Sequence, residues 1–318
     1  TAAASAMGSI IGPIEAEEGY DAEFSAAANI ATAPTGLLIP PSNVMITFSL
    51  VSGGTSVAAL FMAGYIPGIL WGLACMIVIY IFAMKKGYKS TSSFKGKEKL
   101  MVIWQALPSL LMIVIVIGGI IGGIFTATEG SVVAVVYTLI LSLFFYKTIK
   151  FKDLPEIFLA SAEMTGIIVF LIGVSSIMSW VMAFTDIPTL VSNALLGISN
   201  NKYVIFFIIN IILLIVGTFM DMTPATLIFT PIFLPICQQL GMNVIHFGIM
   251  MIFNLCIGTI TPPVGTTLFV GVKVGGTTIE KVIKPLLWYF AAIFAVLMLV
   301  TYVPQISLWL PGVMGYIK

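Results

Sequence analysis

Arginine is absent from this 318-residue chain, and charge of either sign is scarce. All 14 cations are lysines, 13 acidic residues nearly balance them, and charged residues make up only 8% of the chain. An average soluble protein is about 25% charged. Hydrophobic residues reach 59%, and the mean hydropathy is +1.13. This composition excludes a soluble globular domain, predicts an integral protein of the lipid bilayer, and leads us to expect no nucleic-acid partner.

Side chains that carry enzymatic chemistry are equally scarce. The three cysteines (Cys75, Cys237 and Cys256) stand in apolar surroundings without metal-ligand spacing, and we expect them to be small packing residues. His246 is the one histidine, and a packing or interfacial role is expected for it. No HExxH, Walker A, GxSxG or CxxC motif is present. We therefore expect neither an enzyme nor nucleotide hydrolysis.

Long apolar stretches dominate what remains. They lie at residues 61–84, 101–127, 131–146, 164–184, 203–219 and 286–303. A membrane span needs about 20 apolar residues, so these stretches predict an all-α polytopic membrane protein. Six lysines fall within residues 85–99, which assigns that loop to the cytoplasm because cytoplasmic loops are enriched in lysine.

Two segments 222 residues apart repeat one another, and both interrupt apolar sequence. Gly36 stands four residues before the Pro40-Pro41 pair, as Gly258 stands four residues before Pro262-Pro263. The sequence Gly-Gly-Thr follows each pair at the same distance. Duplicated helix interruptions of this kind are typical of the central binding site of secondary transporters.

The match spans roughly residues 1–56 and 223–278, which divides the chain into a first repeat at 1–100 and a second at 101–318. Several spans precede the second copy and none precedes the first, so we expect about 100–120 further residues before Thr1 in a symmetric protein. The orientation of the halves depends on the number of spans per repeat and stays open. An inverted arrangement is favoured, because inverted repeats with broken helices recur in transporters.

Two successive prolines end a helix abruptly and leave carbonyl groups without partners. In hydrocarbon such a backbone must be buried in protein or line a polar cavity. We therefore expect two re-entrant helical hairpins, at about residues 24–56 and 247–278. The alternative is that each pair only kinks an ordinary span.

Oxygen atoms at these interruptions predict a sodium site. A hard cation requires only carbonyl, hydroxyl and carboxylate oxygens. The candidate sodium ligands are Gly36, Pro40, Ser42, Asp221, Thr223, Gly258, Thr261, Pro262 and Gly265, and the candidate substrate-binding residues are Asn43, Thr266 and Lys273.

Asp221 is the strongest single candidate, since it is a lone carboxylate between two apolar runs. A charge at membrane depth costs about 2.5–3.5 kcal/mol on insertion scales and marks function by default. The alternatives are a loop aspartate at the membrane edge and a helix N-cap before Thr-Pro. Lys273 either meets a substrate carboxylate or extends to the interface.

At these residues the chain resembles the large membrane subunit, DctM type, of the tripartite ATP-independent periplasmic (TRAP) transporters. The resemblance covers essentially the whole chain and is most specific at residues 36–42, 60–68, 125–129 and 258–265. It implies a Na⁺-driven importer of organic acids in a bacterial inner membrane, with an elevator-type fold. It also implies two partners, a small membrane subunit and a periplasmic substrate-binding protein.

The family's Na⁺-binding aspartate corresponds to Asp221, and its hairpin tips correspond to Gly36, Pro40, Pro41, Ser42, Gly258, Pro262, Pro263 and Gly265. Some relatives carry arginine at the position of Lys273. Residues 41–54 resemble sialic-acid members more than C4-dicarboxylate members. Two other functions remain open: a stand-alone Na⁺-coupled carboxylate transporter or ion antiporter, and a channel with the tips as its filter.

Overall fold

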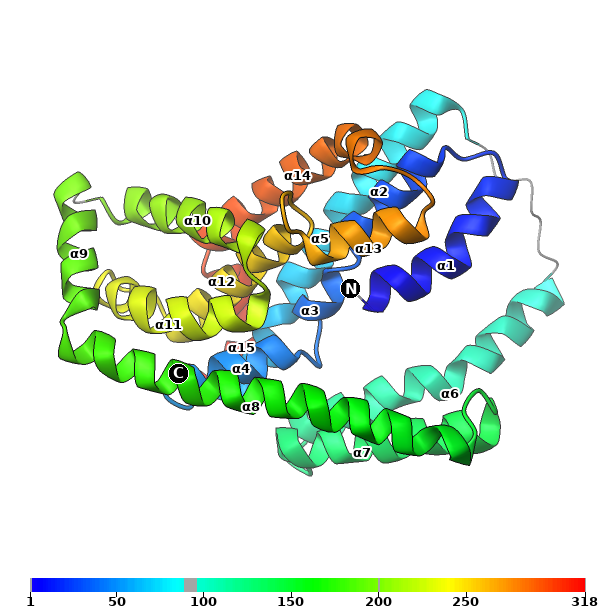
Figure 1. The fold of residues 1–318 in the computed structure, drawn as a ribbon, viewed down its shortest axis with the longest axis horizontal. Helices are drawn as coiled ribbons and strands as arrows, with labels where there is room; N and C mark the ends of the chain where they lie inside the picture. Colours follow the sequence, from blue (N-terminus) through cyan, green and yellow to red (C-terminus); the bar gives the residue numbers. More distant parts are fainter. Residues whose placement is uncertain (1, 89–95, 200, 318) are drawn as a thin grey trace. The chain divides into compact units, whose positions relative to one another are not determined.

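The computed structural model describes residues 2–88, 96–199 and 201–317. Over these residues the chain is all-helical and contains no β-strand, as the composition predicts (Figure 1). It divides into two compact units, the first made of Thr1–Lys89 with Ser175–Lys318 and the second of Ser90–Val174. Residues 89–95 of the lysine-rich loop that was predicted to be cytoplasmic lie outside the described residues.

The first unit contains both copies of the repeat. The first copy forms α1 (Ala2–Glu17), α2 (Ala22–Thr32), α3 (Thr35–Leu38), α4 (Asn43–Val51) and α5 (Val57–Lys86). After α9 (Ile187–Ile198), the unit continues with α10 (Lys202–Phe219), α11 (Met222–Gln239), α12 (Val244–Thr259), α13 (Thr266–Val274), α14 (Ile279–Tyr302) and α15 (Gln305–Val313). Helix α12 forms the core, since every side chain from Ile245 to Thr259 is buried.

The backbone repeats with the sequence. Helices α2 and α12 begin 222 positions apart, and so do α5 and α14. The turns before α2 and α12 contain Gly19 and Gly241 at equivalent positions, both with a positive φ that a residue without a Cβ adopts readily. The Pro40–Pro41 and Pro262–Pro263 peptide bonds, again equivalent, are both cis. Domain limits at 1–100 and 101–318 stay a prediction.

The two copies exchange partners across the unit. Helix α1 contacts α13 and α11 contacts α4, while α2 contacts α14 and α12 contacts α5. The Cys256 Sγ lies 3.9 Å from the main-chain O of Pro34. Pro34 and Cys256 are equivalent residues of the repeat, 222 positions apart. A residue that contacts its counterpart lies on a twofold axis, so a pseudo-twofold axis passes between these two residues. Helices α2 and α12 run in opposite directions in Figure 1, as an inverted repeat requires.

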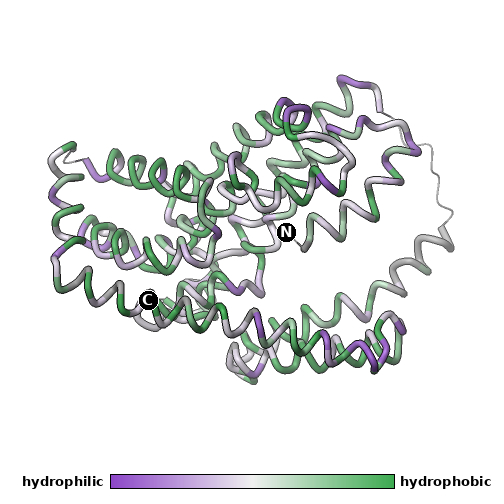
Figure 2. The backbone as a smooth tube through the Cα atoms, viewed as in Figure 1, coloured by the Kyte–Doolittle hydropathy of each residue, from purple (hydrophilic) through white to green (hydrophobic). Residues whose placement is uncertain are grey.

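Among the described residues, five helical segments are long and apolar enough to cross a membrane. They are Val57–Lys86, Thr128–Phe145, Phe151–Val174, Lys202–Phe219 and Ile279–Tyr302. Hydrophobic residues dominate these segments in Figure 2, and hydrophilic ones collect toward their ends. The protein is therefore a multi-pass membrane protein, as predicted. The stretch predicted at 101–127 contains a shorter apolar segment, Ala106–Ile120.

The chain bends at the Pro40-Pro41 pair, and only a short break separates the helical segments on either side. Ala22–Leu38 and Asn43–Val51 meet there at a bend of 47°. A bend of this size fits a broken span as well as a re-entrant loop, so the re-entrant hairpins at 24–56 and 247–278 stay a prediction.

The second unit is formed by α6 (Gly96–Ile121), α7 (Ala127–Ile140), a π-helical turn (Leu141–Phe145), a 3₁₀ turn (Phe151–Asp153) and the first part of α8 (Leu154–Phe184). Helices α6 and α7 contact each other. Thr126 and Glu129 form a capping box at the start of α7, in which the carboxylate accepts a hydrogen bond of 2.8 Å from the Thr126 N–H. This box satisfies N–H groups that a helix start leaves unpaired.

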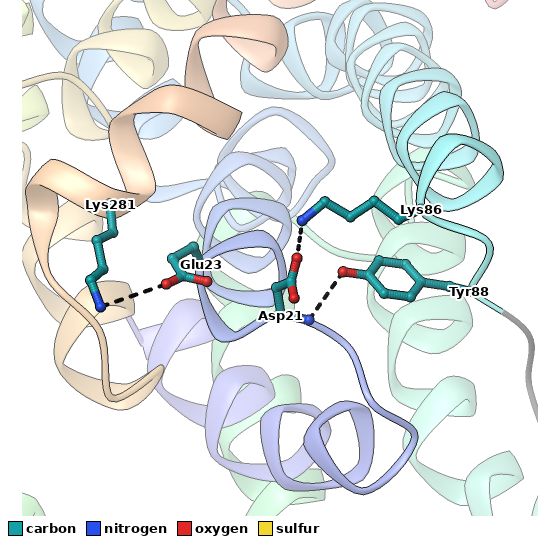
Figure 3. Close-up of polar contacts among 5 residues, drawn as sticks. All are labelled: Asp21, Glu23, Lys86, Tyr88 and Lys281. Atoms are coloured by element: carbon teal, nitrogen blue, oxygen red, sulfur yellow. Dashed lines mark hydrogen bonds and ion pairs between the residues drawn. The ribbon is translucent and has the colours of Figure 1, made fainter.

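A polar cluster joins the start of α2 to the end of α5 and the start of α14 (Figure 3). Lys86 forms an ion pair with Asp21. The Asp21 N–H donates to the Tyr88 hydroxyl at 3.2 Å, and the Lys281 Nζ lies 3.8 Å from the Glu23 carboxylate. The ring of Tyr88 also stacks on that of Tyr20, with centroids 4.3 Å apart. These contacts hold the α1–α2 turn against helices of both copies.

Candidate functional site

The second Pro-Pro pair separates α12 from α13. Helix α12 ends at Thr259 and α13 begins at Thr266. Within this break, which we call the second break, the Thr261 hydroxyl donates to the Ile257 main-chain O at 2.6 Å, and the Gly265 N–H donates to the Thr261 O at 3.1 Å. Prolines supply no N–H groups, so the break has more oxygen acceptors than donors, as a cation site requires.

The turn between α10 and α11 lies against the second break. Met220 and Asp221 both have extended backbones and connect two helices that contact each other, so α10 and α11 form a helical hairpin. The Val264 N–H donates to the Thr218 main-chain O at 3.1 Å. A Cβ built on Gly258 would meet backbone atoms of Gly217 at 2.5 Å, so only glycine permits this approach.

The Asp221 carboxylate is exposed at this turn. Asp221 occupies the N-cap position of α11, but its side chain accepts no capping hydrogen bond. In the part of the chain that the structure describes, it forms no ion pair either. Asp221 is therefore an N-cap residue by its backbone position, but its side chain does not cap the helix. The carboxylate is available to a ligand.

Thr226 is a polar residue that the sequence argument missed. It lies in the first turns of α11 and is 0% exposed, and its hydroxyl has no hydrogen-bond partner in the structure. The predicted neighbour Thr223 is half-buried in the same helix. No signal in a single sequence separates Thr226 from the other threonines of the apolar run.

The first Pro-Pro pair separates α3 from α4, and we call residues 39–42 the first break. Pro40 is buried, while Gly36 and Asn43 are exposed. Ser42 occupies the N-cap position of α4, yet its hydroxyl makes no capping bond. That hydroxyl is buried, with Ser42 2% exposed, and it has no hydrogen-bond partner. A buried hydroxyl without a partner is costly unless something else binds it.

Helices α5 and α12 hold the first break in place. The Trp71 Nε1 donates to the Ala31 main-chain O at 2.8 Å. A Cβ on Gly64 would meet the Leu38 main-chain O at 2.3 Å, so α5 approaches the break as closely as a backbone permits. Cys256 of α12 lies against Pro34, where the pseudo-twofold axis passes. The first and second breaks therefore lie on opposite sides of this axis.

The structure therefore places the predicted sodium ligands in two groups, one at each break. The family model described as "Tripartite ATP-independent periplasmic transporter, DctM component" matches residues 1–306. The chain belongs to this family. It is a TRAP transporter large permease, as the resemblance implied, and its relatives are permeases rather than enzymes.

Three relatives illustrate the match. The "Uncharacterized protein YgiK" of Salmonella typhimurium is 53% identical over 98% of this chain and 71% of its own length. The C4-dicarboxylate TRAP transporter large permease protein DctM of Pseudomonas aeruginosa is 37% identical over 99% of this chain and 73% of its own length. The sialic acid TRAP transporter large permease protein SiaM of Vibrio cholerae is 34% identical over 93% of this chain and 70% of its own length.

The predicted substrate-binding residues of the permease follow these two breaks in the chain. Asn43 begins α4, and Thr266 begins α13 and is half-buried. Lys273 lies in the last turn of α13, seven residues beyond Thr266, and is exposed. It forms no ion pair with a described residue, and its role in substrate binding stays a prediction.

The permease also has a cavity of about 880 Å³ beside the first break. It lies along α1, α2 and the end of α13, and includes Ala28, Thr32 and Gly36. The counterparts of these three residues in the repeat are Met250, Asn254 and Gly258, which lie on the face of α12 that α10 covers.

The packing roles that were predicted for the three cysteines and for the histidine are confirmed. Cys75, Cys237 and Cys256 are all buried and free. His246 is 2% exposed, and its Nε2 lies 2.8 Å from the Val300 main-chain O, so it joins α12 to α14.

Proposed function

We propose that this permease couples the entry of Na⁺ to the import of an organic acid. The observation that carries the proposal is the position of an uncommitted carboxylate, Asp221, on a turn that is bonded to a proline-interrupted helix. Intramembrane carboxylates beside broken helices are typical of ion sites. Nucleotide energy is not required, because the membrane potential contributes about 2.3 kcal/mol per charge per 100 mV.

The ion sites that we propose follow the two breaks. At the second break, Asp221, Thr223, Gly258, Thr261, Pro262 and Gly265 would supply oxygens to Na⁺, and Thr226 adds an unpartnered hydroxyl. At the first break, Gly36, Pro40 and Ser42 would do the same. Carbonyls freed at helix interruptions coordinate cations in this way.

The organic acid would lie between the ion sites. Asn43 and Thr266 begin the helices that follow the breaks, where N–H groups and the positive end of the helix dipole favour an anion. Lys273 adds the nearest full positive charge along α13. Two of the three relatives are named as C4-dicarboxylate and sialic acid permeases. Both kinds of solute carry carboxylates, so we propose a substrate of this chemical class.

We further propose an inverted repeat with an elevator-type movement. We also revise the position of the re-entrant hairpins, which enter and leave the membrane on the same side. A chain that turns back reverses its direction, whereas the first break bends by only 47°. The two-residue turn at Asp221 does reverse the chain. We therefore propose that the breaks lie in discontinuous spans and that α10–α11 is re-entrant.

We also propose that the permease works in a bacterial inner membrane with a small membrane subunit and a periplasmic substrate-binding protein. The family description supports this, since it names a tripartite and periplasmic system.

Uptake into proteoliposomes tests the whole proposal. The permease, with its small subunit, is reconstituted with an inward Na⁺ gradient or a matched K⁺ gradient, and with or without the binding protein. Labelled C4-dicarboxylates and sialic acid serve as solutes. We expect saturable uptake that requires both Na⁺ and the binding protein. Uptake without the binding protein would indicate a stand-alone transporter, and non-saturable flux without Na⁺ would indicate a channel.

A further inference from the structure

A buried polar cluster joins α10 to α12 and α14. Asn210 on α10 and Asn254 on α12 are both 0% exposed. The Asn254 Nδ2 donates to the Oδ1 and to the main-chain O of Asn210, each at 2.8 Å. The Asn210 Nδ2 lies 3.1 Å from the Thr301 Oγ1 on α14. We call Asn210, Asn254 and Thr301 the amide clamp.

The amide clamp is the middle of three attachments along α10. Near the start of the helix, the Tyr302 hydroxyl of α14 donates to the Tyr203 main-chain O at 3.0 Å. At its end, the Thr218 O accepts from Val264 of the second break at 3.1 Å. An 18-residue helix is about 27 Å long. Helix α10 is thus bonded to its neighbours at both ends and at its centre.

Two of the three clamp residues are not repeated in the first copy. The counterparts of Asn254 and Thr301 are Thr32 and Ile79. The Thr32 hydroxyl donates to the Ala28 main-chain O of its own helix at 2.8 Å, and isoleucine cannot form hydrogen bonds. The hydrogen bonds made by Asn254 and Thr301 are therefore specific to the second copy, which contains the Asp221 hairpin.

Buried amides between membrane helices act through hydrogen bonds that lipid cannot replace. If α10 moved away from α12, the amides of Asn210 and Asn254 would lose their partners in an apolar environment, which is unfavourable. The close approach of Gly217 and Gly258 would also be lost.

We propose that Asn210 and Asn254 are positioning residues that hold the α10–α11 hairpin, and with it Asp221, against the second break throughout transport. The hairpin then does not open as a gate, and the solute reaches the site through movement elsewhere in the permease. This inference rests on the proposed Na⁺-coupled transport.

A reversible cross-link tests whether the hairpin must separate. Asn210→Cys and Asn254→Cys are combined in a protein whose native Cys75, Cys237 and Cys256 are alanine. At saturating Na⁺, we expect the oxidised form to import solute at least half as fast as the reduced form, which has neither the clamp nor the cross-link. A loss of tenfold or more on oxidation, restored by reduction, would show that α10 has to leave α12 and would overturn the proposal.

A single substitution tests the positioning role. We expect Asn254→Leu to raise the Na⁺ concentration for half-maximal uptake about tenfold, because the Asp221 turn is no longer held in place. A clamp that served only folding would lower the maximal rate and leave this concentration unchanged, which would refute positioning. The matched control is Thr32→Val, the counterpart in the first copy, for which we expect no change in either quantity.

Hydrogen exchange on the unmodified permease covers the case in which the double-cysteine protein is inactive in both forms. We expect the amides of α10 to exchange as slowly as those of α12, with the same rates in Na⁺ and K⁺, because attached helices open together. Faster exchange along α10 that Na⁺ suppresses would indicate a gate. Absence of Na⁺-dependent uptake by the unmodified permease would refute the proposed function, and the exchange of α10 relative to α12 would still test the attachment.

Discussion

The two copies of the repeat share a backbone and differ, among the described residues, in what lies beside the equivalent glycines Gly36 and Gly258. In the second copy, Gly258 lies so close to Gly217 that an added Cβ would meet its backbone at 2.5 Å. At Gly36, the equivalent position in the first copy, an added Cβ would meet nothing within 4 Å. Helix α10 covers this face of α12. The positions that the 222-residue offset pairs with α10 precede Thr1.

This comparison changes how the cavity of about 880 Å³ is interpreted. Its size is within the range of small-molecule sites, but it occupies the position that α10 fills in the second copy. Its volume is therefore not in itself evidence of a solute site. The first break contains the unpartnered Ser42 hydroxyl, and the turn beside the second break contains the Asp221 carboxylate. The cavity is also lined by an unpartnered hydroxyl, that of Ser25.

The largest effect is expected for Asp221→Asn. The change removes the one carboxylate at the second break and keeps its size, so we expect Na⁺-dependent uptake to fall at least a hundredfold with little change in melting temperature. Uptake in proteoliposomes and thermal unfolding in detergent measure the two quantities. Asp186→Asn, outside both breaks at the start of α9, is the control. Uptake above a tenth of the unmodified rate would remove Asp221 from the ion site.

Gly258→Ala and Gly36→Ala sharpen the comparison of the two copies. The added methyl group in Gly258→Ala would collide with the backbone of α10, and overpacking costs about 1–3 kcal/mol. We therefore expect a clear loss of melting temperature for Gly258→Ala and almost none for Gly36→Ala. Equal losses would mean that another helix closes the first copy as α10 closes the second.

Ser42→Ala separates a structural hydroxyl from an ion ligand. The Ser42 hydroxyl has no protein partner, so its removal is expected to leave stability unchanged or slightly improved. If it binds Na⁺, the Na⁺ concentration for half-maximal uptake rises several-fold. Val264 is the counterpart in the second copy, and Val264→Ala should not change that concentration. An unchanged Na⁺ dependence in Ser42→Ala would exclude this hydroxyl from the site.

The smallest effect is expected at the polar cluster of Figure 3. Asp21 and Lys86 are paired in the first copy, whereas their counterparts are Asn243 and Leu308. The pair is half-exposed, and exposed pairs contribute about 0–1 kcal/mol. A double-mutant cycle of Asp21→Asn and Lys86→Gln should give a coupling energy in this range that declines with salt. A coupling above about 2 kcal/mol would contradict this assignment.

Much of the fold was predictable because membrane sequences constrain it strongly. Apolar length predicted the helices, and the 222-residue offset predicted the equivalence of α2 with α12 and of α5 with α14. The N-cap alternative for Asp221 was drawn from the Thr-Pro that follows it, and Asp221 does occupy the N-cap position of α11.

The remaining features depend on tertiary contacts that local sequence does not encode. Asn210 and Asn254 are ordinary polar residues in apolar runs, and only the packing of α10 on α12 shows that they bond to each other. The same holds for the hydroxyl of Thr226, whose burial depends on neighbours distant in the chain. The return of the chain at Asp221, rather than at a Pro-Pro pair, depends on the angle between helices.

The contact between Cys256 and Pro34 has a consequence for mechanism. Because each of these residues is the other's repeat equivalent, a bulkier side chain at position 256 would push on both interrupted helices from one point. A displacement of either broken helix would likewise move the other, because the Cys256 thiol contacts the Pro34 carbonyl oxygen. Under the proposed Na⁺ coupling, ion binding in one half of the molecule would have a direct mechanical route to the other half, six residues from each proline pair.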